Sequence, residues 1–353
     1  MSITVRVLIC ALALGAGGLG AAAWFAGPTR NAVVIGYQTG VDPTKVAQAE
    51  GWYDRAIAKA AGRPVIWRKF DSGTDVITAL AAGDIDFGDL GSSPLAVAAT
   101  RQLPISTIAL VSRLGRSEAL VARNGSGIAG PADLVGRKVA VPFISTAHYS
   151  LLAALHHWGI DPARVQVLNL SPPQIAAAWA RHDIDAAYVW DPALGDLKVN
   201  GKVLTGSDQV AAWGSPTFDV WVTRRDFAKS NPAAVEAFVR VTIASQDIYR
   251  RDGARWTATS PQSREIAAAT GSRVEDVPGL LASNDYPTAA EQASPALLGR
   301  APAGAGAGAG GGLARALANT AAFLQEQGKV DRVLVDYTPY IDPAPVRRVA
   351  QDQ

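Results

Sequence analysis

Residues 65–102 read VIWRKFDSGTDVITALAAGDIDFGDLGSSPLAVAATRQ, and this stretch decides the fold class. It contains two units in which a short apolar run precedes a helical pattern. Residues 65–70 and 85–90 have the length and composition of strands, while 74–82 and 94–102 have those of helices. Strands that alternate with helices in this way predict an α/β fold built on mostly parallel sheets.

The same alternation continues on both sides of this stretch. Further strands are expected at residues 33–37, 104–112, 118–123, 136–143, 165–170, 184–190 and 218–223, and helices at 43–59, 147–158, 173–181 and 231–249. Two such cycles predict two α/β lobes joined by two hinge strands that lie side by side. The chain should leave lobe 1 (residues 31–123 and 219–353) near Arg123, form lobe 2 (124–218), and return near Asp219. Because ligands of open α/β sheets sit at the carboxyl ends of strands, a cleft between the lobes is expected.

Composition and charge exclude several classes of protein. The 353 residues carry a net charge of only +2 without a block of Lys and Arg, which argues against nucleic-acid binding. The single cysteine, Cys10, lies in the leading apolar segment, so no intrachain disulfide or cysteine metal site is expected. No metal-ligand spacing occurs among the histidines, and no cofactor is expected. The histidines are His148, His156, His157 and His182.

The N-terminus has the pattern of an export signal. Arg6 precedes an apolar run over residues 7–27, and cleavage after Ala23 would leave small residues at the required positions. Residues 1–26 are therefore interpreted as a signal peptide or, because the run is long enough to span a bilayer, as an N-terminal anchor. Both interpretations place the body outside the cytoplasm. A low-complexity Gly/Ala segment at 301–312 is expected to be a flexible insertion.

One loop of the opening stretch could bind an anion. Residues 91–94 read GSSP, and Pro94 suits the first helical position, which makes Ser93, next to Ser92, the expected N-cap. Free N–H groups at such a helix start favour a negatively charged ligand. The alternative is an ordinary capped helix without a ligand.

The second lobe repeats this arrangement. Residues 144–149 read ISTAHY and lead into a helix that Ser145 or Thr146 could cap. His148 would lie in the first turn, where the positive helix end disfavours its protonated form, so it is either a neutral donor to a ligand or a packing residue. Two helix starts that face each other across a cleft would hold a carboxylate, phosphate or sulfonate.

Two carboxylates are expected at the cleft floor. Glu118 begins the first crossing strand, and Asp219 lies at the start of the returning strand. Two neighbouring buried carboxylates are costly unless a cation meets them, and an ammonium group of a ligand would do so. The alternative is that Arg113 or Arg116 pairs with them.

An aromatic side chain completes the predicted cleft. Trp190 ends a strand of lobe 2 and should face the cleft, while Gln38 follows the first strand of lobe 1. A Trp face attracts a cationic group by about 0.5–2 kcal/mol. An anion clamp at one end, a carboxylate pair at the other and an aromatic wall between them together predict a small zwitterionic ligand.

Several stretches closely resemble one family, the taurine-binding periplasmic proteins of ABC importers. They are VDPTKVAQAE, WRKFDSGTDVITALAAGDIDFGDLGSSPLAVAA, SEALV, VAVPFISTAHYSLLAALHHWGI, AAYVWDPAL, PTFDVWVTRRDFA and FLQEQGKV. The resemblance implies a periplasmic-binding-protein fold of the type with two hinge strands (type II), and taurine, 2-aminoethanesulfonate, as the ligand. It also implies a periplasmic, monomeric, non-enzymatic protein whose partners are a membrane permease and its ATPase.

The resemblance also matches ligand-binding positions of the family. The matched residues are Ser92, Ser93, Ser145, Thr146, His148, Trp190, Glu118 and Asp219. Two positions depart from the pattern: the family often has Thr at Ala147 and a small residue at Asp191. The charge of Asp191 beside the cleft could change the selectivity among amino-sulfonates.

Other functions remain as alternatives. A binding protein for alkanesulfonates, aminophosphonates or nitrate-like anions has the same fold, but Glu118 and Asp219 would repel a ligand that is purely anionic. Enzymes related to pyrimidine synthases also share the fold. However, the chain lacks a nucleophile elbow, a metal cluster and a cofactor loop. A transcription-factor effector domain is not supported, because no DNA-binding helical segment precedes the first strand.

Overall fold

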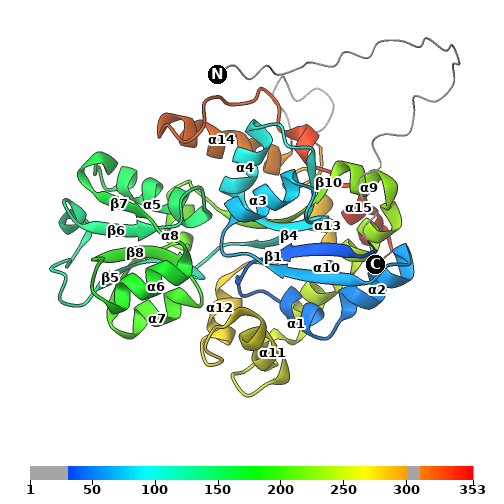
Figure 1. The fold of residues 1–353 in the computed structure, drawn as a ribbon, viewed down its shortest axis with the longest axis horizontal. Helices are drawn as coiled ribbons and strands as arrows, with labels where there is room; N and C mark the ends of the chain where they lie inside the picture. Colours follow the sequence, from blue (N-terminus) through cyan, green and yellow to red (C-terminus); the bar gives the residue numbers. More distant parts are fainter. Residues whose placement is uncertain (1–30, 301–310, 353) are drawn as a thin grey trace, which may run out of the picture. The chain divides into compact units, whose positions relative to one another are not determined.

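The computed structural model of the protein describes residues 31–300 and 311–352. Their strands form two five-stranded sheets with helices packed around them (Figure 1). The first sheet, in lobe 1, has the order β2 (Val65–Lys69), β1 (Val33–Tyr37), β3 (Phe87–Gly91), β10 (Phe218–Arg224) and β4 (Ile105–Arg113). The second sheet, in lobe 2, has the order β7 (Gln166–Asn169), β6 (Lys138–Val141), β8 (Ala186–Trp190), β5 (Glu118–Arg123) and β9 (Gly201–Gly206). The predicted two-lobed α/β fold is confirmed.

The helices divide between the lobes. Lobe 2 contains α5 (Thr146–His157), α6 (Pro172–Ala180), α7 (Ala193–Val199) and α8 (Ser207–Ala212). Lobe 1 contains α1 (Thr44–Ala49), α2 (Trp52–Ala61), α3 (Gly73–Ala81), α4 (Ser92–Thr100), α9 (Arg225–Ser230), α10 (Pro232–Asp252), α11 (Pro261–Thr270), α12 (Val277–Ser283), α13 (Ala289–Ala293), α14 (Gly312–Glu326) and α15 (Ala344–Gln351). Short 3-10 turns lie at Pro131–Leu134, Pro162–Arg164, Gly253–Arg255 and Thr338–Tyr340.

The strand order of lobe 1 places a polar residue of β10, Asp219, beside the start of α4. The apolar strand β1 pairs in parallel with β2 and β3, as expected for a strand that is buried on both faces. The returning strand β10 then lies antiparallel to β3, with Asp219 opposite Gly91. Asp219 therefore lies beside the start of α4, although the two are far apart in sequence.

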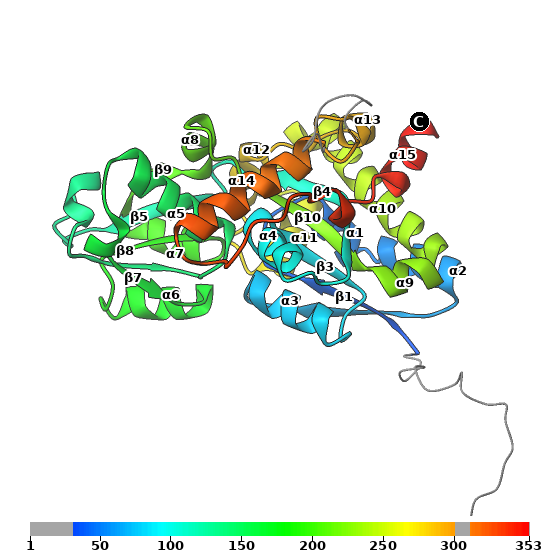
Figure 2. The same cartoon turned by 90° about the horizontal axis from the view of Figure 1, so that it is seen from above.

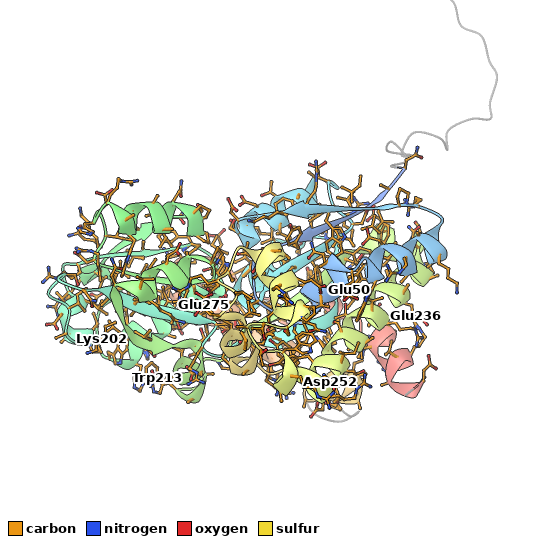
Figure 3. The ribbon with its side chains drawn as sticks, turned by 90° about the horizontal axis from the view of Figure 1, so that it is seen from below. Glu50, Lys202, Trp213, Glu236, Asp252 and Glu275 are labelled. Carbon is orange, nitrogen blue, oxygen red and sulfur yellow. The ribbon has the colours of Figure 1, made fainter. Side chains whose placement is uncertain are left out.

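The chain changes lobes at two short connections. β4 ends at Arg113 in the first sheet, and β5 begins at Glu118 in the second sheet. The chain therefore crosses earlier than the predicted exit near Arg123. It returns between α8 and β10, in the segment that begins at Trp213 (Figure 3). The ring of Trp213 stacks on His157 with centroids 3.9 Å apart. The expectation that the Glu118 and Asp219 strands lie side by side is wrong, because β5 pairs with β8 and β9, whereas β10 pairs with β3 and β4.

Two parts of the expected element pattern differ from the structure. The single helix expected at residues 43–59 is divided into α1 and α2 by Gly51, whose φ of 69° suits glycine far better than other residues. The strand β9 and the helix α8 have no counterpart among the expected elements. Both are short, and their patterns are too brief to separate strand from helix.

A C-terminal helix of lobe 1 makes additional contacts with lobe 2. α14 packs against α4 of lobe 1. Figure 2 shows α14 running over lobe 1 with one end beside the helices of lobe 2. At that end Phe323 meets Tyr149 of α5 edge to face, with ring centroids 5.0 Å apart. Beyond the helix, the ammonium of Lys329 lies 5.0 Å from the ring centroid of Phe143.

Two predicted segments fall outside the described residues. These are the leader or anchor at residues 1–26 and all but the last two residues of the Gly/Ala segment at 301–312. Within the described ranges, no helix combines the length and the apolar character needed to span a membrane.

Candidate functional site

A pocket lies between the two lobes and is lined by residues of both. The lining residues are Gln38, Gly40, Val41, Asp42, Gly73, Asp89, Gly91, Pro94, Val111, Ser112, Leu114, Ser117, Glu118, Ser145, Thr146, Trp190, Asp191, Asp219, Leu280 and Asn284. Six of the nine predicted site residues are among them: Gln38, Glu118, Ser145, Thr146, Trp190 and Asp219. The other three are Ser92, Ser93 and His148, which lie next to lining residues but not in the pocket wall.

The helix start in lobe 1 differs from the predicted one by two residues. α4 begins at Ser92, and its N-cap is Gly91 with extended backbone (φ −72°, ψ 165°), so the expectation that Ser93 is the N-cap is wrong. The hydroxyls of Ser92 and Ser93 are fully buried and have no hydrogen-bond partner among the described residues. Buried hydroxyls without partners are rare, because each loses its hydrogen bonds to water. The start of α4 therefore retains unused donors.

The helix start in lobe 2 is capped as predicted. The Ser145 hydroxyl accepts a hydrogen bond from the backbone N–H of His148 at 3.0 Å and donates to the carbonyl of Pro142 at 2.6 Å. Thr146, the first residue of α5, donates to Oε1 of Glu118 at 2.5 Å. A Cβ placed on Gly91 would lie 2.6 Å from Cγ2 of Thr146. The two helix starts therefore meet across the pocket.

The two predicted carboxylates lie beside these helix starts. Glu118 is buried, and burial raises its pKa to about 7, although the hydroxyls of Thr146 and Ser207 both donate to it. Burial and the nearby carboxylates of Asp89 and Glu118 raise the pKa of Asp219 well above its usual value. The predicted separation of an anion clamp at one end from a carboxylate pair at the other does not occur, because Thr146 contacts Glu118 and Gly91 lies beside Asp219.

The arginines considered as partners for these carboxylates are paired elsewhere. Arg113 forms an ion pair with Asp285 at 2.7 Å, and the exposed Arg116 lies 4.0 Å from Asp208. Within the described residues, no arginine forms an ion pair with Glu118 or Asp219.

Two further carboxyl groups, those of Asp42 and Asp89, line the same pocket. The sequence interpretation did not select them. Asp89 lies in the buried strand β3, and burial raises its pKa to about 6, with Asp42 adding to the rise and Lys45 opposing it. Its Oδ1 has no hydrogen-bond partner among the described residues, whereas its backbone carbonyl accepts a bond from Nε2 of Gln38 at 3.0 Å. The signal in the sequence was an aspartate inside an apolar strand, which is costly unless it has a function.

Trp190 and Asp191 form part of the lobe 2 wall. Trp190 lies opposite Glu118 in the pairing of β8 with β5 and lines the pocket, as expected for an aromatic wall. Asp191 is buried, and burial raises its pKa to about 6. The hydroxyl of Thr39 in lobe 1 donates to the backbone carbonyl of Asp191 at 3.0 Å. This bond joins the two lobes at the edge of the pocket.

The loop that precedes α12 also approaches Asp191. Charges of Arg273 and Asp276 in this loop act on the Asp191 carboxyl. Figure 3 labels Glu275, which lies between these two residues at the side of lobe 1 that faces lobe 2. This region of contact between the lobes therefore contains charged side chains.

His148 is a packing residue in this structure. Its ring stacks on Phe143 with centroids 4.6 Å apart, and its Nδ1 accepts a hydrogen bond from the backbone N–H of Ile144 at 3.2 Å. Burial, aided by the charge of Lys329, lowers the pKa of His148 to about 4. The imidazole is therefore neutral at physiological pH, as the sequence analysis expected.

The chemistry of the pocket is that of a binding site. It offers five buried or partly buried carboxyl groups, three from lobe 1 and two from lobe 2, next to hydroxyl donors and two helix starts. No group of three or more His, Cys, Asp or Glu side chains in the described ranges could hold a metal ion. Such a pocket suits a small ligand that carries both a cationic and an anionic group.

Comparisons with known proteins agree with this chemistry. The sequence pattern of the NMT1/THI5 like family matches residues 38–252. The taurine-binding periplasmic protein of Escherichia coli (strain K12) is 48% identical to the chain over 88% of this chain and 91% of that protein. A putative aliphatic sulfonates-binding protein of the same strain is 26% identical over 62% of this chain and 67% of its own length.

Solved structures show the same fold at low sequence identity. The alkanesulfonate-binding protein SsuA from Xanthomonas axonopodis pv. citri, bound to MOPS, has a TM-score of 0.68 at 22% identity and covers 87% of this chain and 96% of its own. The desulfurization enzyme DSZB has a TM-score of 0.57 at 16% identity, covering 91% and 99%. The fold therefore serves both binding proteins and an enzyme, and the sequence similarity decides the family. The chain belongs to the NMT1/THI5 like family and is a close relative of the taurine-binding periplasmic protein.

Proposed function

We propose that this protein is the periplasmic solute-binding component of an ABC importer. It captures taurine between its lobes and delivers the taurine to a membrane permease that an ATPase drives. The observation that carries the proposal is the meeting of Glu118, Asp89 and Asp219 with the starts of α4 and α5 in one interlobe pocket. Export places the protein in the periplasm, where it acts as a monomer without catalysing a reaction.

The carboxyl groups supply the site for the ligand's ammonium. Burial is the main cause of the raised pKa values of Glu118, Asp89 and Asp219, and neighbouring carboxylates add to the rise for Asp89 and Asp219. Burial favours the neutral form of these carboxyls, and an ammonium group placed between them favours the ionised form. The face of Trp190 provides a wall for the carbon next to this ammonium.

The helix starts supply the site for the sulfonate. Only two carbons separate the ammonium and sulfonate groups of taurine, so donors and acceptors have to lie close together, as they do here. The unused hydroxyls of Ser92 and Ser93, with the N–H groups at the start of α4, are the donors in lobe 1. Thr146 and the start of α5, which Ser145 caps, are their counterparts in lobe 2.

Two predicted residues have supporting roles in this proposal. Gln38 holds the end of β3 in place through its bond to the Asp89 carbonyl and presents its amide to the pocket. His148 packs on Phe143 and gives its backbone N–H to the Ser145 cap, so it supports the α5 helix start. The His148 ring itself, held by Ile144 and Phe143, makes no bond to the ligand.

A ligand panel tests this function directly. Thermal unfolding of the purified protein is followed with taurine, 2-aminoethylphosphonate, ethanesulfonate, β-alanine and sulfate. A ligand present at 100 times its Kd stabilises the folded state by about 2.7 kcal/mol. We expect taurine to stabilise strongly and ethanesulfonate and sulfate weakly. Stabilisation by ethanesulfonate equal to that by taurine would contradict the role assigned to the carboxyl groups.

The second candidate is a binding protein for other amino-sulfonates or aminophosphonates. The observation that favours it is Asp191, a further buried carboxyl group in the pocket wall. A ligand with a longer or second cationic group could use it. In the same panel, a stronger response to 2-aminoethylphosphonate than to taurine would favour this candidate.

A further inference from the structure

A buried lysine lies behind the acidic side of the pocket. Lys45, the second residue of α1, is only 1% exposed, and its Nζ lies 3.6 Å from Oδ2 of Asp42 and 5.3 Å from the ring centroid of Tyr37. This Nζ has no hydrogen-bond partner among the described residues. It does not belong to the pocket wall, whereas Asp42 and Asp89 do. Lys45 is therefore a cation held just behind two of the pocket's carboxyl groups.

The position of Lys45 is costly for the fold alone. An ammonium without hydrogen bonds loses much of its solvation on burial, and the first turn of a helix disfavours a positive charge. The ion pair with Asp42 is longer than a charge-assisted hydrogen bond. The other oxygen of Asp42 is already engaged by the backbone N–H of Thr44 at 2.8 Å and by its hydroxyl at 2.5 Å. A role beyond a simple structural ion pair is needed to account for this arrangement.

The charge of Lys45 acts on the ligand-facing carboxyls. It lowers the pKa of Asp89 and of Asp219, in each case against a rise caused chiefly by burial. The other ionisable groups that face these carboxyls are Asp42 before α1, Glu118 at the start of β5, and the buried phenol of Tyr53 on α2. Among these neighbours Lys45 is the cation that opposes the acidic groups.

We propose that Lys45 is a positioning residue for specificity: it supplies one fixed positive charge behind the pocket, so that Asp89 and Asp219 accept one ligand ammonium group. The inference rests on the proposed function. Without this fixed charge, protons would occupy the carboxyls instead, and a ligand ammonium would have to displace them. Lys45 therefore makes the capture of a singly cationic zwitterion less dependent on pH.

The test compares Lys45→Met with Lys59→Met, which removes an exposed lysine of α2 and leaves the pocket unchanged. Taurine Kd is measured by calorimetry at about pH 6 and about pH 8.5, with circular dichroism to check folding. We expect the Lys45→Met variant to lose at least tenfold in affinity near pH 6, and roughly threefold or less near pH 8.5, where the carboxyls ionise without help. Lys59→Met should match the wild type.

Two results would overturn the inference alone. They are an equal loss of affinity at both pH values, which would indicate a structural role, and an affinity equal to that of the wild type at both. If Lys45→Met does not fold, Lys45→Arg provides the second measurement, because it keeps the positive charge and changes the shape of the side chain. The ratio of its taurine Kd at about pH 6 to that at about pH 8.5 should match the ratio of the wild type, and a different ratio would overturn the inference. A wild type that binds no taurine at either pH would overturn the proposed function as well.

Discussion

Gly91 illustrates how a single residue sets the distance between the lobes. Its backbone is ordinary for any amino acid (φ −72°), so glycine is not needed there for conformation. A side chain at this position would instead collide with Thr146 of lobe 2, whose Cγ2 would lie 2.6 Å from the new Cβ. The absence of a side chain at Gly91 therefore allows the two helix starts to meet.

We predict that Gly91→Ala lowers taurine affinity at least about fivefold, because overpacking of this kind typically costs 1–3 kcal/mol. The matched control is Gly40→Ala, since Gly40 also lines the pocket but a Cβ there would meet no atom within 4 Å. Calorimetric titration of both variants measures the difference. Equal affinities for the two variants would show that contact at Gly91 does not limit closure.

Glu118 links the pocket to the pH dependence of stability. Its pKa rises from 4.5 to about 7 on folding, so the folded state keeps a proton that the unfolded state has already lost. The stability of the ligand-free protein should therefore fall as pH rises from about 4.5 to about 7. Glu118→Gln should reduce that fall by up to about 3 kcal/mol, since one pKa unit corresponds to about 1.4 kcal/mol. Urea unfolding at pH 5 and pH 8 measures the fall, and an unchanged fall in the variant would refute the assignment.

At the residue scale, the sequence predicts only part of the site. Glu118, Asp219 and Trp190 could be selected because each begins or ends an expected strand, where parallel sheets place their ligands. Asp42, Asp89 and Lys45 could not be grouped with them. They come together only through the pairing of β1, β3 and β10, a long-range arrangement that no local pattern encodes.

At the scale of elements, α14 joins lobe 1 to lobe 2 in addition to the two connections. It packs on α4, and its Phe323 contacts Tyr149 of α5, the helix whose first residue donates to Glu118. The hydroxyl of Tyr149 also interacts with Thr320 of α14. α14 therefore contributes side-chain contacts that hold the two lobes together.

We expect Phe323→Ala to weaken taurine binding about two- to tenfold, because an edge-to-face aromatic pair contributes about 0.5–1.5 kcal/mol beyond its area. Val335→Ala, at a side chain that is 98% exposed, is the control and should bind as the wild type does. Affinity is read by calorimetry and folding by circular dichroism. Unchanged affinity in a folded Phe323→Ala variant would mean that α14 has no influence on closure.

The sequence predicts strands and helices well where the apolar pattern is continuous, and less well at the residues where a helix begins or ends. The strand at residues 33–37 matches β1, because its apolar run is continuous. The N-cap of α4 was placed at Ser93 because Pro94 favours the first helical position, yet the helix begins two residues earlier after Gly91. The correct cap depends on how β3 ends beside β10, which is a tertiary feature.

At the scale of the whole molecule, both lobes contribute to one pocket, and neither sheet alone contains the site. Lobe 1 supplies Asp42, Asp89 and Asp219, while lobe 2 supplies Glu118 and Thr146. The fold class follows from strand and helix alternation, but the similar folds of sulfonate-binding proteins and a desulfurization enzyme show that fold alone does not give function. The proposed function depends instead on the carboxyl and hydroxyl groups that the two lobes place in one pocket.

The central claim is that the carboxyl groups of Glu118, Asp89 and Asp219 recognise the ammonium group of the ligand. The most direct measurement is the Kd of taurine and of ethanesulfonate for the wild type, Glu118→Gln and Asp219→Asn, with the exposed Asp183→Asn as control. We predict that the wild type prefers taurine by at least about 100-fold, or about 2.7 kcal/mol, and that each pocket variant reduces this preference to about tenfold or less. Equal binding of both ligands by the wild type, or an equal loss of both in the variants, would contradict the account.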